Sequence, residues 1–536
     1  MRYHASCKIK KKPDIFSLRI IIFVNMNKLS SLALAALLSA CFIPALAKDK
    51  TAAQAYLDRK LSEEPFRSGL VGVLAVKISG DTIAESGSLR KLIPASNTKL
   101  ITTGLAIKGL GKDYRLSTAL GYDGDVSDGV LRGDLYIVGG GDPTLASSDP
   151  GSLAADSLFS VWKSMLTARG IRRIDGRIIG DGRYLDGPIE LDSWAYNDLG
   201  TFYGTGCNGL IYSRNILKVN VAPGNAEGSP VRVSNFRPNL PWLEFRNNST
   251  TSAPGTGDQL YLFNTDLAPV SELRGSFASG KVPKTEEFSH KFGPLACSSA
   301  FSDYLRKNGV KVDGEPSYID SYGKIVSIDR SGRGLGRPEG TACRVPDLHI
   351  IGDTESMTVK EIARITNSRS DNLYAETLLR ILSKERTGSA SYDSCKVVIM
   401  RELASLGVDT STGARIVDGS GLSRHDCISP DFFCRFLRSM YLDSGCFWDY
   451  LSTISRPGAP GMKSCLAGKP DAVRSRIRMK SGSMDGVLCF SGYVMPVSDR
   501  KEDVTVFSVM TNNCPDAEDR VRAFVNELIY LIANEN

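Results

Sequence analysis

The sequence contains little histidine and no closely spaced cysteine pair. Four of the 536 residues are histidines, and no Cys-x-x-Cys occurs. After residue 47 the chain retains only His290, His349 and His425. Structural zinc sites need four Cys or His ligands at close and recurrent spacings. The sequence therefore predicts no metal centre, and we expect no cofactor.

A charge excess of one sign is also missing from most of the chain. The formal net charge is +7, but residues 1–47 contain seven basic residues and one acidic residue. The remainder is close to neutral, which argues against nucleic-acid binding through a basic surface. With 42% hydrophobic and 23% charged residues, and without repeats or low-complexity segments, we expect a packed protein with more than one domain.

The N-terminus has the pattern of an export signal. Residues 29–43 form an apolar run that follows Lys28, and small residues stand at −3 and −1 of a cut after Ala47. This pattern predicts a signal peptide over residues 1–47 and a periplasmic protein with no transmembrane segment in the mature chain.

Two details of this segment leave alternatives open. Met26 stands where a signal peptide would begin, so residues 1–25 are interpreted as a mis-start upstream of the true one. The sequence Leu-Ser-Ala-Cys at 38–41 is similar to a bacterial lipoprotein box, in which Cys41 would carry the lipid. Simple cleavage after Ala47 is the favoured interpretation.

Ten cysteines follow residue 47, and six of them lie between Cys427 and Cys514. Disulfides are chemically allowed in an exported protein, and we expect most of them in that C-terminal stretch if they form. The alternative is that these cysteines are buried thiols.

The hydrophobic pattern predicts an α+β fold with an insertion. Short alternating runs separated by Gly, Asn, Asp and Pro turns fill residues 113–344, which predicts one or more β-rich inserted domains. Residues 48–112 and 345–536 would together form the enclosing domain of helices and sheet. We expect helices at 51–64, from Pro94 to about 106, at 358–366, at 373–382 and at 516–533, and strands at 70–78, 474–480, 486–494 and 504–510.

Three short motifs carry the chemistry: Ser96-Asn97-Thr98-Lys99, Ser370-Asp371-Asn372 and Lys480-Ser481-Gly482. Ser-x-x-Lys alone occurs five times and is not informative, but the order and context of the three motifs select Ser96. A serine hydroxyl needs a neighbouring base, and Lys99, three residues along a helix, lies on the same face.

The remaining motif residues would complete a nucleophilic site. Burial and a nearby cation, Lys480, would lower the pKa of Lys99 so that it acts as a base. Ser370 can shuttle a proton, and Asn372 can hold Lys99 or a substrate amide. The catalytic residues that we predict are therefore Ser96, Lys99, Ser370, Asn372 and Lys480.

The segment after Lys480 is expected to bind substrate. It would form a strand edge on which a peptide adds as an extra strand. The backbone N–H groups of Ser96 and Ser483 would form an oxyanion hole, and Lys480 and Ser481 would hold a carboxylate. We assign Ser481, Gly482 and Ser483 to substrate binding. Arg474, Arg476 and Arg478 would make one face of the strand basic, either to attract acidic substrate or merely as a solvated face.

Beyond the trio, the sequence resembles the D-alanyl-D-alanine carboxypeptidase/endopeptidase family, the class C low-molecular-mass penicillin-binding proteins. The resemblance spans nearly the whole chain after residue 47. It implies a transpeptidase-like domain, with helices on a five-stranded antiparallel sheet, interrupted by mostly β inserts. The resembling segments are 94–103, 131–145, 202–210, 370–380, 418–424, 480–494 and 506–513.

The resemblance also implies the activity and its partners. We expect a serine DD-peptidase, a carboxypeptidase or endopeptidase or both, that acts on peptidoglycan stem peptides through an acyl-enzyme on Ser96. β-Lactam antibiotics would be covalent inhibitors. Arg424 and Asp198 would contact the diamino acid of the stem peptide, and Asp485 would modify substrate preference. The alternatives are an inactive wall-binding protein of the same fold, or a β-lactamase or esterase.

Overall fold

The computed structural model describes residues 50–320, 322–329, 331–339, 347–443, 445–515 and 517–535. The predicted signal peptide, residues 1–47 with Cys41, lies outside the described residues. The described elements belong to one compact unit that begins at Thr51.

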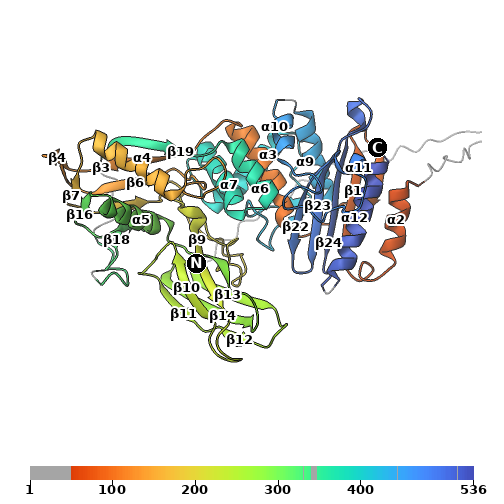
Figure 1. Cartoon of the computed structure of the whole chain (residues 1–536). Coiled ribbons are helices and arrows are strands. Elements are labelled where there is room, and N and C mark those ends of the chain that lie inside the picture. Colours follow the sequence, from red (N-terminus) through yellow and green to blue (C-terminus); the bar gives the residue numbers. More distant parts are fainter. Residues whose placement is uncertain are drawn as a thin grey trace, which may run out of the picture. The chain divides into compact units, whose positions relative to one another are not determined.

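Strands from the two ends of this unit form one five-stranded sheet (Figure 1). All neighbouring strands are antiparallel, as the family resemblance implies. The strand order is β2 (Thr82–Ser86), β1 (Leu70–Lys77), β24 (Thr505–Asn512), β23 (Val487–Val494) and β22 (Ile477–Met484). The strand that contains the Lys480 motif, β22, therefore lies at an edge of this sheet.

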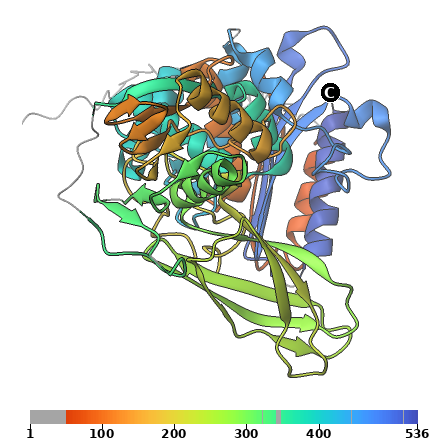
Figure 2. The ribbon, with the colours of Figure 1, turned by 60° about the vertical axis from the view of Figure 1, so that its left-hand side comes forward.

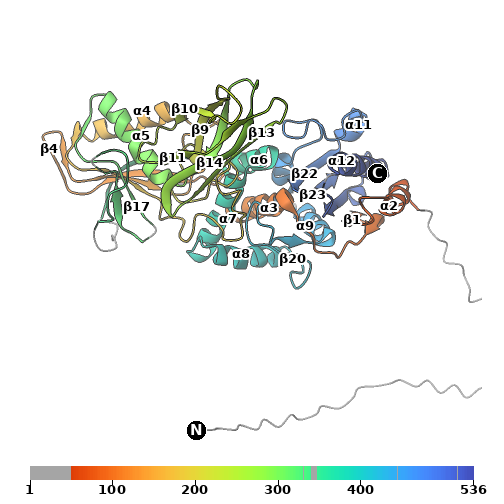
Figure 3. The same ribbon diagram turned by 90° about the horizontal axis from the view of Figure 1, so that it is seen from below.

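Helices cover both faces of the sheet, because the central strands are apolar on both sides. One face packs against α2 (Ala52–Leu61) and α12 (Glu518–Asn534), which lie side by side in Figure 2. The opposite face packs against a helical layer seen in Figure 3. This layer contains α3 (Thr98–Leu110), α6 (Val359–Arg369), α7 (Asn372–Thr387), α8 (Tyr392–Ser405), α9 (Pro430–Leu442) and α10 (Phe447–Thr453).

Residues between α3 and α6 form further sheets around a second core. A six-stranded sheet has the order β18 (Ile325–Ser327), β17 (Ser317–Ile319), β8 (Ile178–Asp181), β6 (Leu135–Gly139), β3 (Ser117–Tyr122) and β19 (His349–Glu355). A four-stranded sheet has the order β16 (Lys311–Val312), β7 (Arg173–Ile174), β5 (Val130–Arg132) and β4 (Asp125–Ser127). Helices α4 (Ala155–Ala168) and α5 (Gly293–Lys307) supply core residues here.

Two smaller sheets complete this region. One has the order β10 (Arg232–Arg237), β9 (Ile216–Ala222) and β15 (Lys284–Ser289). In the other, β14 (Ala268–Ala278) pairs with β11 (Glu244–Asn247), β12 (Thr250–Ser252) and β13 (Asp258–Thr265). The remaining short elements are η2 (Ser213–Asn215), β20 (Ala414–Arg415), β21 (Cys427–Ile428), α11 (Asp471–Arg474) and η3 (Lys501–Asp503).

Two local predictions were wrong. Pro94 does not begin an α-helix: a 3₁₀ turn, η1 (Ala95–Asn97), comes first, and α3 begins at Thr98. Ala95 has a positive φ of 47°, which interrupts the helical path. The predicted basic strand face does not form either, because Arg474 ends α11 and Arg476 precedes β22.

The nine cysteines in the described part of the chain are free thiols, and seven of them are buried. They fit the buried-thiol alternative rather than a disulfide framework. No helix among the described residues combines the length and apolarity needed to cross a bilayer.

Candidate active site

Ser96 and Lys99 meet where η1 passes into α3. The Nζ atom of Lys99 lies 2.8 Å from Oγ of Ser96. Ser96 is half-buried, whereas Lys99 has no exposed surface. A buried amine in hydrogen-bond contact with a serine hydroxyl can remove the proton of that hydroxyl when the amine is neutral.

Two further acceptors fix the orientation of the Lys99 amine. Its Nζ lies 2.6 Å from Oδ1 of Asn372 and 2.7 Å from the carbonyl oxygen of Ser420. Nδ2 of Asn372 donates to the carbonyl oxygen of Tyr203 at 3.0 Å, so the amide of Asn372 presents its oxygen to Lys99. A neutral amine has two N–H groups, and these two acceptors use both of them. The lone pair is then directed at Ser96.

Burial shifts the pKa of both lysines of the site downward. It lowers the pKa of Lys99 to about 8, although the carboxylates of Asp418 and Glu376 oppose the shift. It also holds the pKa of Lys480 well below its usual value, and repulsion from Lys99 adds to the effect. Two buried amines that repel each other favour a state in which one of them is neutral.

Lys480 connects the third motif to the second. Its Nζ lies 3.0 Å from Oγ of Ser370 and 2.6 Å from the carbonyl oxygen of Ser481. Ser370 ends α6 in the left-handed conformation, with φ 59°, and the next helix starts at Asn372. This sharp turn directs the Ser370 hydroxyl toward Lys480 and the Asn372 amide toward Lys99.

Gly482 allows β22 to approach Ser96 closely. A Cβ atom at Gly482 would lie 2.5 Å from the carbonyl oxygen of Pro94 and 2.9 Å from the backbone nitrogen of Ser96. A side chain at this position would displace the strand or the turn that holds Ser96. Ser483 follows on the exposed edge, so two backbone segments converge beside the Ser96 hydroxyl.

Arg424 and Asp198 lie near each other beside the site. Burial raises the pKa of Asp198. Two interactions oppose this rise: a hydrogen bond from the Tyr203 hydroxyl at 3.2 Å and the positive charge of Arg424. Nη2 of Arg424 lies 3.4 Å from the carbonyl oxygen of Asp485. The structure thus brings Arg424 and Asp198 to the Tyr203 segment, which is itself hydrogen-bonded to Asn372.

Three buried carboxylates that act on Lys99 were not predicted from the sequence. Glu376 is 1% exposed, and Asp418 and Asp426 are fully buried. One signal was present: Asn372 and Glu376 are four residues apart on α7 and therefore share a face. The contribution of Asp418 and Ser420 could not be read in this way, because their segment is far from Lys99 in sequence.

Sequence reasoning also missed the contacts that fix the Ser370-Asp371-Asn372 turn. Asp371 caps α7 by accepting from the backbone of Tyr374. Its other oxygen is 2.6 Å from Arg214 and 3.1 Å from Arg369. Arg369 in turn pairs with Asp149 at 2.6 Å. Nothing local to the turn predicts partners at positions 149 and 214.

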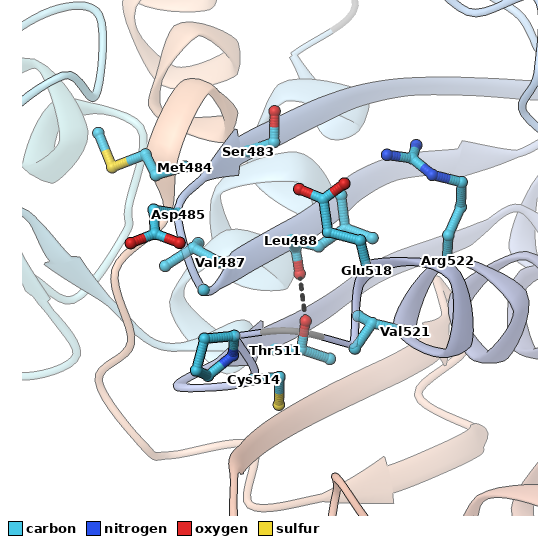
Figure 4. A pocket seen from close by; sticks show the side chains of 12 residues that line it. Ser483, Met484, Asp485, Val487, Leu488, Thr511, Cys514, Glu518, Val521 and Arg522 are labelled. Atoms are coloured by element: carbon cyan, nitrogen blue, oxygen red, sulfur yellow. Dashed lines mark hydrogen bonds between the residues drawn. The ribbon is translucent and has the colours of Figure 1, made fainter. Parts of the chain in front are cut away.

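A cavity of about 270 Å³ lies at the end of the β22–β23 hairpin. Figure 4 shows Ser483, Asp485, Glu518 and Arg522 around it. Neither Ser96 nor Lys99 lines this cavity, so it lies beside the reacting groups rather than around them.

The fold defines the class of architecture, which is the penicillin-binding fold. Penicillin-binding protein 4 (dacB) from Haemophilus influenzae has the same fold, with a TM-score of 0.71 and 19% identity over 90% of this chain and 98% of that one.

The chain belongs to the D-Ala-D-Ala carboxypeptidase 3 (S13) family, whose sequence profile matches residues 53–319 and 342–529. It is 28% identical over 464 residues to a D-alanyl-D-alanine carboxypeptidase of Actinomadura sp. strain R39, covering 84% of this chain and 79% of the relative. It is 23% identical over 492 residues to D-alanyl-D-alanine carboxypeptidase DacB of H. influenzae, covering 88% and 91%. The predicted family and enzyme class are confirmed.

Proposed function

We propose that this protein is a serine DD-peptidase that acts on peptidoglycan stem peptides through an acyl-enzyme on Ser96. The observation that carries the proposal is the contact between Oγ of Ser96 and Nζ of Lys99, 2.8 Å apart at a buried amine. Family membership supports the substrate class, a peptide that ends in D-Ala-D-Ala.

In the proposed mechanism Lys99 takes the proton of Ser96 as Oγ attacks the D-Ala carbonyl carbon. The carbonyl oxygen becomes an oxyanion that the backbone N–H groups of Ser96 and Ser483 stabilise. Collapse of this intermediate breaks the amide bond and leaves an ester on Ser96. Lys99 passes the proton that it took from Ser96 to the leaving amine by way of the Ser370 hydroxyl, which Lys480 contacts at 3.0 Å, and Lys99 is neutral again. Water then hydrolyses the ester, with Lys99 again as base.

Substrate would bind along the free edge of β22, where a peptide can pair as an added strand. Lys480, Ser481 and Gly482 would then lie next to the terminal carboxylate. Arg424 and Asp198 would contact the charged end of the diamino acid, since one is cationic and the other acidic.

The proposal includes the organisation and location of the chain. Residues 48–112 and 345–536 would form the catalytic domain, and residues 113–344 the insert. The pairing of β19 with β3 extends the sheet of this insert to Glu355. We propose a periplasmic location, from the signal pattern of residues 1–47; lipidation at Cys41 is the alternative.

Covalent labelling with a fluorescent penicillin tests the proposal, because the strained β-lactam amide mimics the scissile bond. We expect the wild type to be labelled and Ser96→Ala to remain unlabelled. Ser160→Ala is the matched control: it alters another Ser-x-x-Lys, but Lys163 there contacts the carbonyl oxygen of Asn308. Labelling of Ser96→Ala would overturn the assignment of the nucleophile.

The same assay separates the alternatives. An inactive wall-binding protein would not be labelled, and a β-lactamase or esterase would turn penicillin over rapidly without a lasting adduct. Mass spectrometry of muropeptides, with and without cross-linked substrate, then measures the carboxypeptidase and endopeptidase activities.

A further inference from the structure

We propose that Glu376 is a positioning residue for Lys99: it holds the Ser420 peptide whose carbonyl group orients the lysine amine, and its charge sets the pH range in which the amine works as a base. This inference rests on the proposed function, in which Lys99 activates Ser96.

A short chain of hydrogen bonds connects Glu376 to Lys99. Oε1 of Glu376 accepts from the backbone N–H of Ser420 at 2.7 Å and of Gly419 at 3.1 Å. The carbonyl oxygen of the same Ser420 then lies 2.7 Å from Nζ of Lys99. The carbonyl oxygen of Gly419 accepts from Thr102 at 2.6 Å, one turn further along α3. Glu376 thus anchors the segment that faces Lys99.

The position of the Ser420 carbonyl group determines the direction of the Lys99 lone pair. Asn372 and Ser420 supply the two acceptors that occupy the N–H groups of the neutral amine. If the Ser420 carbonyl moved away, an N–H group of Lys99 could turn toward Ser96 instead of the lone pair. Proton removal from Ser96 would then be slower, since general-base catalysis depends strongly on geometry.

The charge of Glu376 acts on two buried cations, Lys99 and Arg380. Arg380 is on the same helix, but its guanidinium donates to the carbonyl oxygens of Asp186, Pro188, Cys207 and Ala390. Hydrogen bonds thus fix the position of Arg380, and Lys99 is the cation on which Glu376 acts within the proposed reaction. The other titratable groups around Glu376 are Asp418, Asp426, Tyr392, Cys207 and Cys395.

The direction of the pH effect follows from these charges. Burial, and then Asp418, raises the pKa of Glu376, and the ionised Glu376 carboxylate in turn opposes the lowering of the Lys99 pKa by burial. A negative neighbour favours the ammonium form of Lys99. Removing that charge lowers the pKa of Lys99 and moves the acid limb of the acylation profile to lower pH.

Two substitutions separate position from charge. Glu376→Gln keeps an acceptor for the Ser420 N–H but removes the charge. Glu376→Asp keeps the charge but shortens the side chain. Asp142→Asn is the matched control, because Asp142 is also a buried carboxylate but bonds to Thr144.

The experiment measures the second-order rate constant of acylation by fluorescent penicillin from about pH 6 to about pH 10. For Glu376→Gln we expect the acid limb to move down by about one pH unit and the plateau to change little, because the acceptor for the Ser420 N–H is kept. For Glu376→Asp we expect a lower plateau with the acid limb in place. Asp142→Asn should match the wild type, and thermal melts identify any variant that is not folded at the assay temperature.

The outcomes are distinct. If the wild type is not labelled, or Ser96→Ala is, the proposed function fails. If the wild type is labelled but Glu376→Gln keeps its acid limb in place, the role of the Glu376 charge is wrong. If Glu376→Gln does not fold, an unchanged plateau in Glu376→Asp overturns the positioning role on its own.

Discussion

Nη2 of Arg214 lies 2.6 Å from Oδ2 of Asp371, although the two residues are 157 positions apart in the sequence. Asp371 stands between Ser370 and Asn372, and its side chain is 2% exposed. A residue of the predicted insert therefore helps to fix the turn that contacts both lysines of the site.

We expect Arg214→Ala to destabilise the protein by about 2–3 kcal/mol, because it leaves the buried Asp371 carboxylate with one cation, Arg369, instead of two. Acylation by penicillin should also slow, since Asp371 caps the helix that begins at Asn372. Urea unfolding gives the stability change. Lys218→Ala, which breaks the exposed pair with Glu287, should cost less than about 1 kcal/mol. Equal losses of unfolding free energy in the two variants would contradict the role of Arg214 in holding Asp371.

Asn372→Asp should move the acid limb of acylation to higher pH by about one unit or more. The new carboxylate would lie against Lys99 and stabilise its ammonium form, the opposite sign to Glu376→Gln. The pH profile of acylation rates measures both shifts. Asn526→Asp, on α12 and bonded to the backbone of Leu466, is the control and should leave the profile unchanged. A downward shift for Asn372→Asp would show that Lys99 is not the titrating base.

Gly482→Ala should reduce acylation about 100-fold, because a 1 Å displacement of reacting groups has a cost of this size. The added Cβ would lie 2.5 Å from the carbonyl oxygen of Pro94. Gly336→Ala is the control, since its Cβ would meet no described atom nearer than the carbonyl oxygen of Ser327 at 3.4 Å. Acylation rates at saturating pH and thermal melts are measured for both. A Gly482→Ala variant with wild-type rates would mean that β22 does not approach Ser96 this closely.

Asp142 should make the protein less stable as the pH rises from about 4 to about 6. Burial raises the pKa of Asp142 to about 6, from a usual value of 3.8. The unfolded chain therefore loses this proton more readily than the folded one, and deprotonation favours unfolding across that range. Relative to Asp142→Asn, the wild type should lose about 2–3 kcal/mol. Urea unfolding at several pH values measures the difference. Asp519→Asn, at an exposed carboxylate, should behave as the wild type does.

The helices and strands that frame the site could be read from local pattern. The apolar stretch beginning at Leu70 forms β1, and the C-terminal amphipathic segment forms α12, because periodicity and burial agree there. The start of α3 could not be predicted, because Pro94 favours a helix start while Ala95 adopts a positive φ and a 3₁₀ turn comes first. The prediction of a basic strand face was also wrong. The alternating pattern of Arg474, Arg476 and Arg478 was extended across the end of α11, where the chain is not yet a strand.

The sequence by itself determined the family-specific motifs, the pairing of Ser96 with Lys99 three residues away, and the α+β pattern with its β-rich insert; the five-stranded antiparallel sheet followed only from the family resemblance. These depend on short spacings and on hydrophobic period, which are local properties. Only the tertiary structure decided which distant groups surround the amine of Lys99: the Ser420 carbonyl, the Glu376 carboxylate and the Asn372 amide fixed by Tyr203. Burial and contacts across hundreds of residues set the pKa and orientation of that amine, and no local pattern encodes either.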